Sequence, residues 1–131
     1  MAIRDTLLAN LSVALANSNV TTSSELPFVA GGTPLYDKNM KKLYLDYDNN
    51  STTELFNTLN PADDVFQQEI LVSGYFSVDA KNQPGDIDTI VNTIRNARQS
   101  VSNCFVRECE ITNDIADDRI TYTIEFRFLT I

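Results

Sequence analysis

Two stretches of the chain alternate between mainly apolar and mainly polar positions. From Ile70 to Val78 every second residue is apolar or glycine, and from Ile120 to Phe128 every second residue is apolar. Because successive side chains of a strand point to opposite faces, this period predicts two strands, Gln68–Ala80 and Arg119–Thr130. Each strand would turn one face to the core and a polar face away from it.

A different period follows the first strand. Apolar residues recur at intervals of three or four between Ile87 and Val101, which predicts a helix with one buried stripe. Pro84-Gly85 separates this helix from the strand, and Asp86 is a suitable N-cap. A similar stripe predicts a helix over Ile3–Asn17. Its other face is uncharged, which fits either a solvated surface or contact with another subunit.

Weaker patterns complete the fold. Met40–Asp48 and Cys104–Thr112 read as strands, and the second would form a hairpin with the last strand through the acidic turn 113–118. Residues 49–51 read as a turn and 52–64 as irregular. The fold class expected is α+β in a single domain over residues 1–131: an antiparallel or mixed sheet of about four strands, with two helices packed on one face, in the order α-β-β-α-β-β.

The segment 25–39, ELPFVAGGTPLYDKN, is an extended apolar loop. Its prolines and its glycine pair exclude a helix. Loops of this length in a small domain often contact a partner, although folding over the protein's own core is an equal alternative.

The overall charge restricts the class of partner. The 131 residues carry a net charge of −8 with a pI near 4.3, and the basic residues are scattered. Affinity for nucleic acid comes from clustered Lys and Arg, so general nucleic-acid binding is disfavoured. The chain contains no apolar run of the ~20 residues that span a bilayer and no signal-peptide pattern at its start, so we expect no membrane partner and synthesis in the cytoplasm.

Catalytic and metal chemistry have few candidates. The chain has no histidine, which excludes Ser–His and Cys–His pairs, and it has no phosphate-binding glycine motif. Cys104 and Cys109 are five positions apart and would face opposite sides of a strand as free thiols. The acidic turn could hold a hard cation, but its spacing fits a solvated hairpin tip better. We therefore expect no cofactor, no metal and no enzymatic activity.

The most distinctive pieces of the chain are LPFVAGGTPLY and VDAKNQPGDIDTIVNTIRNAR. Together with the N-terminal helix IRDTLLANLSVALA and the closing strand ITYTIEFRFLTI, they cover nearly the whole chain. In length, element order and character the chain resembles the tail terminator, or tail completion, proteins of long-tailed bacteriophages, the group that includes the phage lambda terminator.

The resemblance implies a structural virion protein of the tail and neck, assembled in the host cytoplasm. Such a protein forms a ring, typically of six copies, that caps the tail tube, stops its polymerisation and meets the head connector, while DNA passes through without specific binding. Alternatives are a head-closure or tube subunit of the same kind of virion, or a non-viral small α+β binding domain. The candidate interface residues are those of the apolar loop and the acidic tip: Phe28, Gly31, Gly32, Pro34, Tyr36, Asp114, Asp117 and Asp118.

Overall fold

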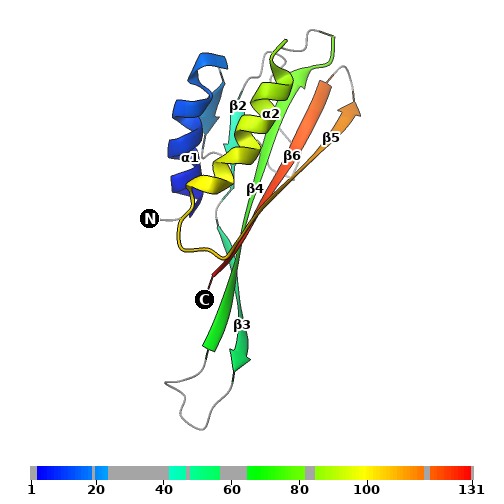
Figure 1. The fold of residues 1–131 in the computed structure, drawn as a ribbon. Helices are drawn as coiled ribbons and strands as arrows, with labels where there is room; N and C mark the ends of the chain where they lie inside the picture. Colours follow the sequence, from blue (N-terminus) through cyan, green and yellow to red (C-terminus); the bar gives the residue numbers. More distant parts are fainter. Residues whose placement is uncertain are drawn as a thin grey trace.

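The computed structural model describes residues 3–18, 20–23, 42–46, 48–56, 65–81, 85–116 and 119–130. Two helices, two short 3₁₀ segments and six strands lie in these ranges (Figure 1). In chain order they are α1 (Ile3–Ala14), η1 (Ala16–Ser18), β1 (Thr21–Ser23), β2 (Lys42–Leu45), β3 (Asn49–Phe56), β4 (Val65–Asp79), α2 (Ile87–Asn96), η3 (Ala97–Ser100), β5 (Val106–Ala116) and β6 (Arg119–Thr130).

The strand β4 organises the sheet. Along one edge it pairs antiparallel with β6 from Gln68 to Asp79. Its other edge pairs first with β3 and then with β2, both antiparallel. The sheet continues to β5 beside β6 and to β1, which runs parallel to β2. Among the described residues, β1 and β3 therefore form one side of the sheet and β5 forms the other.

This architecture corrects the predicted fold class. The described residues form a mixed sheet of six strands, not about four, and the order is α-β-β-β-β-α-β-β. The predicted turn at 49–51 and the first part of the predicted irregular stretch, 52–56, were wrong, because Asn49–Phe56 is β3. The rest of that stretch, 57–64, lies outside the described residues. The predicted turn 113–118 was wrong over its first four positions, because β5 runs on to Ala116.

Several local predictions are confirmed. The last two strands form the expected antiparallel hairpin, with Val106–Ala116 paired to Arg119–Leu129. The second helix starts after Asp86, although no side-chain hydrogen bond caps it. The loop 25–39 lies outside the described residues, so the prediction made for it stays a prediction. In the described part of the chain no helix is long and apolar enough to cross a membrane.

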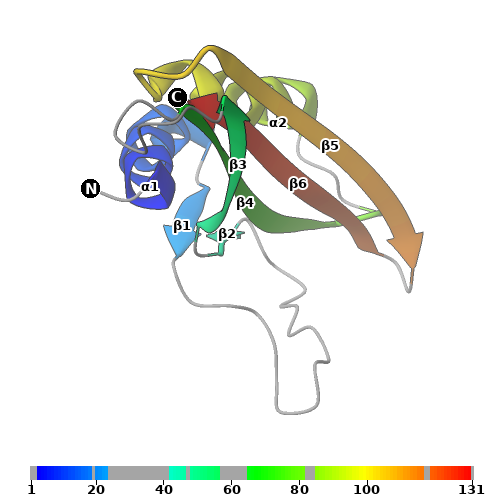
Figure 2. The ribbon, with the colours of Figure 1, turned by 90° about the horizontal axis from the view of Figure 1, so that it is seen from below.

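One face of the sheet carries the core. Both helices lie over this face, as Figures 1 and 2 show, and their buried side chains join those of the strands in one cluster. Burial at roughly 25 cal/mol per Å² of apolar surface holds these layers together. The largest fully buried members are Leu7, Leu11, Leu15, Leu43, Leu45, Val72, Phe76, Ile90, Ile94, Ile124, Phe126 and Phe128.

A carboxylate fixes the start of α1. The backbone N–H groups of Ile3 and Arg4 donate to the two oxygens of Asp48, at 3.0 and 2.8 Å. The first N–H groups of a helix have no partner within the helix, and the helix dipole favours a negative charge there. Asp48 lies between β2 and β3, so this contact ties the first helix to the sheet.

Gly74 allows β2 to approach β4 closely. A Cβ atom placed on Gly74 would lie 2.5 Å from Leu45 Cδ2 and 2.8 Å from the Tyr44 carbonyl oxygen. The second neighbour is backbone and cannot rotate away. A side chain at position 74 would therefore force the two strands apart.

Replacing Gly74 with alanine should lower the free energy of unfolding by about 1–3 kcal/mol, the usual cost of overpacking a core. Urea denaturation measures this loss. The matched control is Gly85→Ala, where an added Cβ meets nothing within 4 Å and little change is expected. A Gly74→Ala variant as stable as the Gly85→Ala control would contradict the described packing of β2 on β4.

Removing the carboxylate that caps α1 should also destabilise the fold. Asp48→Ala is expected to cost about 1 kcal/mol, because two helix N–H groups lose their acceptors. Asp48→Asn keeps one acceptor oxygen and should cost less. Thermal unfolding followed by circular dichroism ranks the stabilities of wild type, Asp48→Asn and Asp48→Ala. Equal stability of these three proteins would rule out the capping role.

Candidate interaction surface

The face of the sheet opposite the helices is polar across three strands. Cross-strand pairing places side chains of β4, β6 and β5 on this face in rows, such as Leu71–Arg127–Glu108 and Ser73–Glu125–Glu110. We call it the helix-free face. Its charged members on these strands are Glu69, Asp79, Glu108, Glu110, Asp114, Arg119, Glu125 and Arg127.

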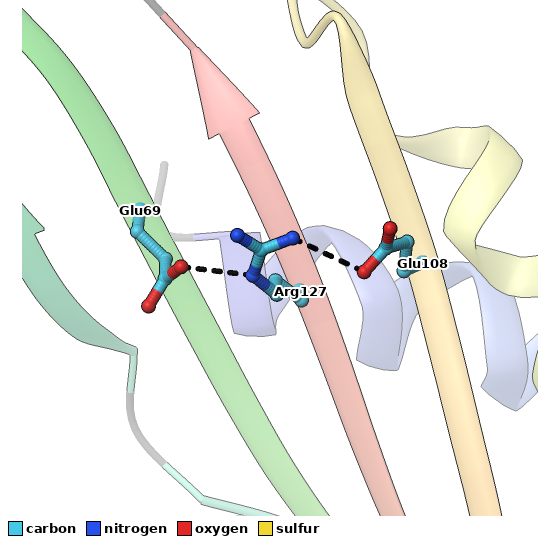
Figure 3. A network of polar contacts seen from close by, with 3 residues as sticks. All are labelled: Glu69, Glu108 and Arg127. Carbon is cyan, nitrogen blue, oxygen red and sulfur yellow. Dashed lines mark hydrogen bonds and ion pairs between the residues drawn. The ribbon is translucent and has the colours of Figure 1, made fainter.

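Arg127 joins the three strands across this face (Figure 3). Its Nε donates to Glu69 Oε2 on β4 at 2.8 Å, and its Nη1 donates to Glu108 Oε2 on β5 at 3.2 Å. The hydrogen bond with Glu69, and then that with Glu108, raises the pKa of Arg127 above its usual value. All three groups are partly or largely exposed, so the network adds little to stability.

Two other carboxylates of the helix-free face have no arginine opposite them in the strand pairing. Glu110 lies directly opposite Glu125, and both side chains are exposed. Like charges facing each other across a strand pair are unfavourable. This arrangement weakens the isolated sheet slightly, and it gives the face an acidic character that would repel a polyanion.

Of the candidate interface residues, only Asp114 lies in the part of the chain that the structure describes. Asp114 lies on β5, exposed and paired in register with Thr121, on the helix-free face. It is thus part of a strand and not of a hairpin tip. Asp117 and Asp118 lie outside the described residues, as do Phe28, Gly31, Gly32, Pro34 and Tyr36, so the structure does not bring these residues together or separate them.

Sequence reasoning missed four exposed large apolar side chains. They are Val13 on α1, Phe66 on β4, Phe105 before β5 and Ile115 on β5. Phe66 lies on the part of β4 that pairs with β3 and projects beyond the helices in Figure 1. Phe105 and Ile115 lie at the two ends of the alternation that includes Cys109 and Ile111, past the point where another element covers it, and sequence alone does not reveal that point. Val13 lies on the face of α1 away from its buried residues.

The two cysteines are free and half-buried. Cys109 points to the helix side of β5, and its burial raises the pKa of the thiol to about 11, although the nearby Arg95 and Arg98 lower it in part. The thiolate is the reactive form, so Cys109 is nearly inert at neutral pH. A structural role in packing therefore fits this residue better than a catalytic one.

The described residues contain no group of three or more Cys, Asp or Glu side chains placed to hold a metal ion. They do contain an open hollow between the end of α1 and β1, lined by Ser12, Ala16, Val20, Thr21 and Thr22. None of these described lining residues is charged. Comparison with protein-family models and with curated proteins gives no match to this chain.

Reversing one charge of the unfavourable Glu110–Glu125 pair should stabilise the protein. Glu110→Lys places opposite charges face to face and should add about 0.5–1 kcal/mol at low salt. Urea denaturation at low and high salt measures this gain, which should shrink as salt rises. The control is Asp114→Lys, which makes the same change of two charges on the same strand and face, opposite Thr121. An equal gain in both variants would show that only net charge matters.

Proposed function

We propose that this protein is a tail terminator of a long-tailed bacteriophage. In this role it is a structural virion protein, not an enzyme. It forms a ring, six copies by the resemblance, on the last ring of the tail tube. The ring stops tube polymerisation and forms the joint to the head connector.

The observation that carries the proposal is the acidic helix-free face, on which Glu108, Glu110, Asp114 and Glu125 are exposed. It spans β4, β5 and β6, and its carboxylates outnumber its two arginines. A channel that lets DNA pass must not hold the phosphate backbone, and a negative wall meets this requirement. The helix-free face would line the channel, with the helices on the outside of the ring.

The shape of the sheet supports the same role. In Figure 1 β3 and the first part of β4 extend away from the two helices as an antiparallel pair. Such a two-stranded extension gains little stability alone. Contact of this extension with the tube or the connector would cover it, and the exposed Phe66 supplies apolar surface for that contact.

Tail length tests the proposed function directly. The tail genes that accompany this gene would be expressed with and without it, and the products measured by negative-stain electron microscopy. We expect tubes of uniform length with the protein and overlong tubes without it. Unchanged lengths would rule out a terminator, and stacking of the purified protein into open-ended tubes would identify a tube subunit instead.

A further inference from the structure

The strand β5 has an open edge. It pairs with β6 along one edge, and among the described strands none pairs with the other. This outer edge is 11 residues long, and Figure 2 shows β5 as the last strand on its side of the sheet. Backbone N–H and C=O groups along such an edge can pair with another extended chain. The side chains on the two sides of the edge decide which chain can bind there.

The helix side of this edge is basic near the start of β5. Arg107 faces the helix side, because its partner in β6 is Phe128, a core residue. Burial raises the pKa of the Cys109 thiol on the same side of β5, and the charges of Arg95 and Arg98 partly offset this rise. Both of these arginines therefore lie close to β5. Together with Arg107 they place three guanidinium groups on one side of an acidic protein.

These three arginines form no ion pair with a carboxylate in the part of the chain that the structure describes. Arg107 Nε donates to the Val101 carbonyl, and Arg98 Nη1 donates to the Arg95 carbonyl at 2.8 Å. The C-terminal end of a helix favours positive charge, which suits Arg95 and Arg98. Arg107 lies on a strand, where this reason does not apply. A guanidinium group has five N–H donors, and a carboxylate matches their geometry.

The two sides of the β5 edge differ in charge. On the helix-free side, Glu110 and Asp114 are exposed and have no arginine opposite them in the pairing with β6. On the helix side, Arg107 lies near one end of the strand, and Ile115, which is 69% exposed, lies near the other. A bound strand turns alternate side chains to the two sides. The edge therefore favours a chain with basic side chains on one side, and with a carboxylate and apolar side chains on the other.

We propose that the outer edge of β5 binds an extended segment of another protein, which joins the sheet as an added strand. The segment has basic side chains opposite Glu110 and Asp114, a carboxylate opposite Arg107 and an apolar side chain opposite Ile115. A second β5 does not meet these requirements. Its helix-free side has no basic residue, so two paired β5 edges would bring only carboxylates together there. This inference goes beyond the proposed function and does not depend on it.

Two peptides with blocked ends test the contact. Glu-Thr-Val-Lys-Val-Thr-Thr-Lys-Val places these side chains opposite residues 107–115 in a parallel strand, and the reversed sequence does so in an antiparallel strand. Fluorescence anisotropy of the labelled peptides should show binding of one of the two. The control, made in the same direction as the peptide that binds, is Glu-Thr-Lys-Val-Val-Thr-Thr-Val-Lys. It has the same composition but turns both lysines to the helix side, and it should bind about 10-fold more weakly or less.

Exchange of charges tests each side of the edge separately. Arg107→Glu should weaken binding of the peptide about 5-fold, and a peptide with lysine in place of its glutamate should restore the affinity. Asp114→Lys should act in the same way with a peptide whose facing lysine becomes glutamate. Asp114 is exposed, so this variant should fold like wild type. The control is Lys42→Glu, which makes the charge change of Arg107→Glu on β2, away from β5, and should bind the original peptide like wild type.

Hydrogen exchange of the backbone amides shows where the peptide lies. Binding should slow exchange in β5 and leave β3 unchanged, because new backbone hydrogen bonds form only along the β5 edge. Equal binding of the control peptide, no binding of either peptide at about 1 mM, charge exchanges that fail to restore affinity, or unchanged exchange in β5 would each overturn the proposal. Slower exchange in β5 that follows protein concentration without peptide would place a second copy at the edge, and would also overturn it.

Discussion

The fold depends on the use of both edges of β4. Along one edge β6 pairs with it over most of its length, and along the other β3 and β2 follow one another. This arrangement requires β2 to pass close to Gly74, where the absence of a side chain leaves room for Leu45 and the Tyr44 carbonyl. Because β4 is longer than the layer of helices, part of the sheet projects beyond the core, as Figure 1 shows.

The two helices pack on one face of the sheet, and the charged side chains of β4, β5 and β6 lie on the other face. On the covered face, alternate side chains of β4 and β6 pack against α1 and α2 in one cluster. On the other, Arg127 holds Glu69 and Glu108 across three strands, while Glu110 and Glu125 face each other without a cation between them in the pairing. Carboxylates kept in an unfavourable arrangement fit a surface selected for its charge and not for stability. This is the basis for proposing a channel wall.

The sequence was sufficient to predict the strands and the helix that bury one face in the core, because burial imposes a hydrophobic period on them. The alternation in β4 and β6 and the stripe of α2 identified these elements, since each has one face in the core. It failed for β3, whose start Asn49-Asn50-Ser51 is typical of a turn. The exposed Asn49, Asn50, Ser51 and Thr52 have no buried face to impose a pattern, and pairing with β4 alone makes them a strand.

The candidate surface could be predicted only in part. Sequence alone identified the acidic character and Asp114, and it noted the uncharged face of the first helix. The Glu69–Arg127–Glu108 network depends on the register of three strands, which no local pattern fixes. Likewise, Ile115 is exposed because α2 does not pack over this part of β5. How far α2 covers β5 is decided by packing between segments that are distant in the sequence.

The central claim is that copies of this chain surround a channel with the helix-free face inward. A cryo-electron microscopy reconstruction of the assembled protein, alone or at the end of a tail tube, tests it most directly. The account predicts a closed ring in which Glu110, Glu125 and Arg127 line the lumen and α1 and α2 lie on the outside. A ring lined by the helices, or an assembly in which the helix-free face is buried against a neighbouring copy, would contradict it.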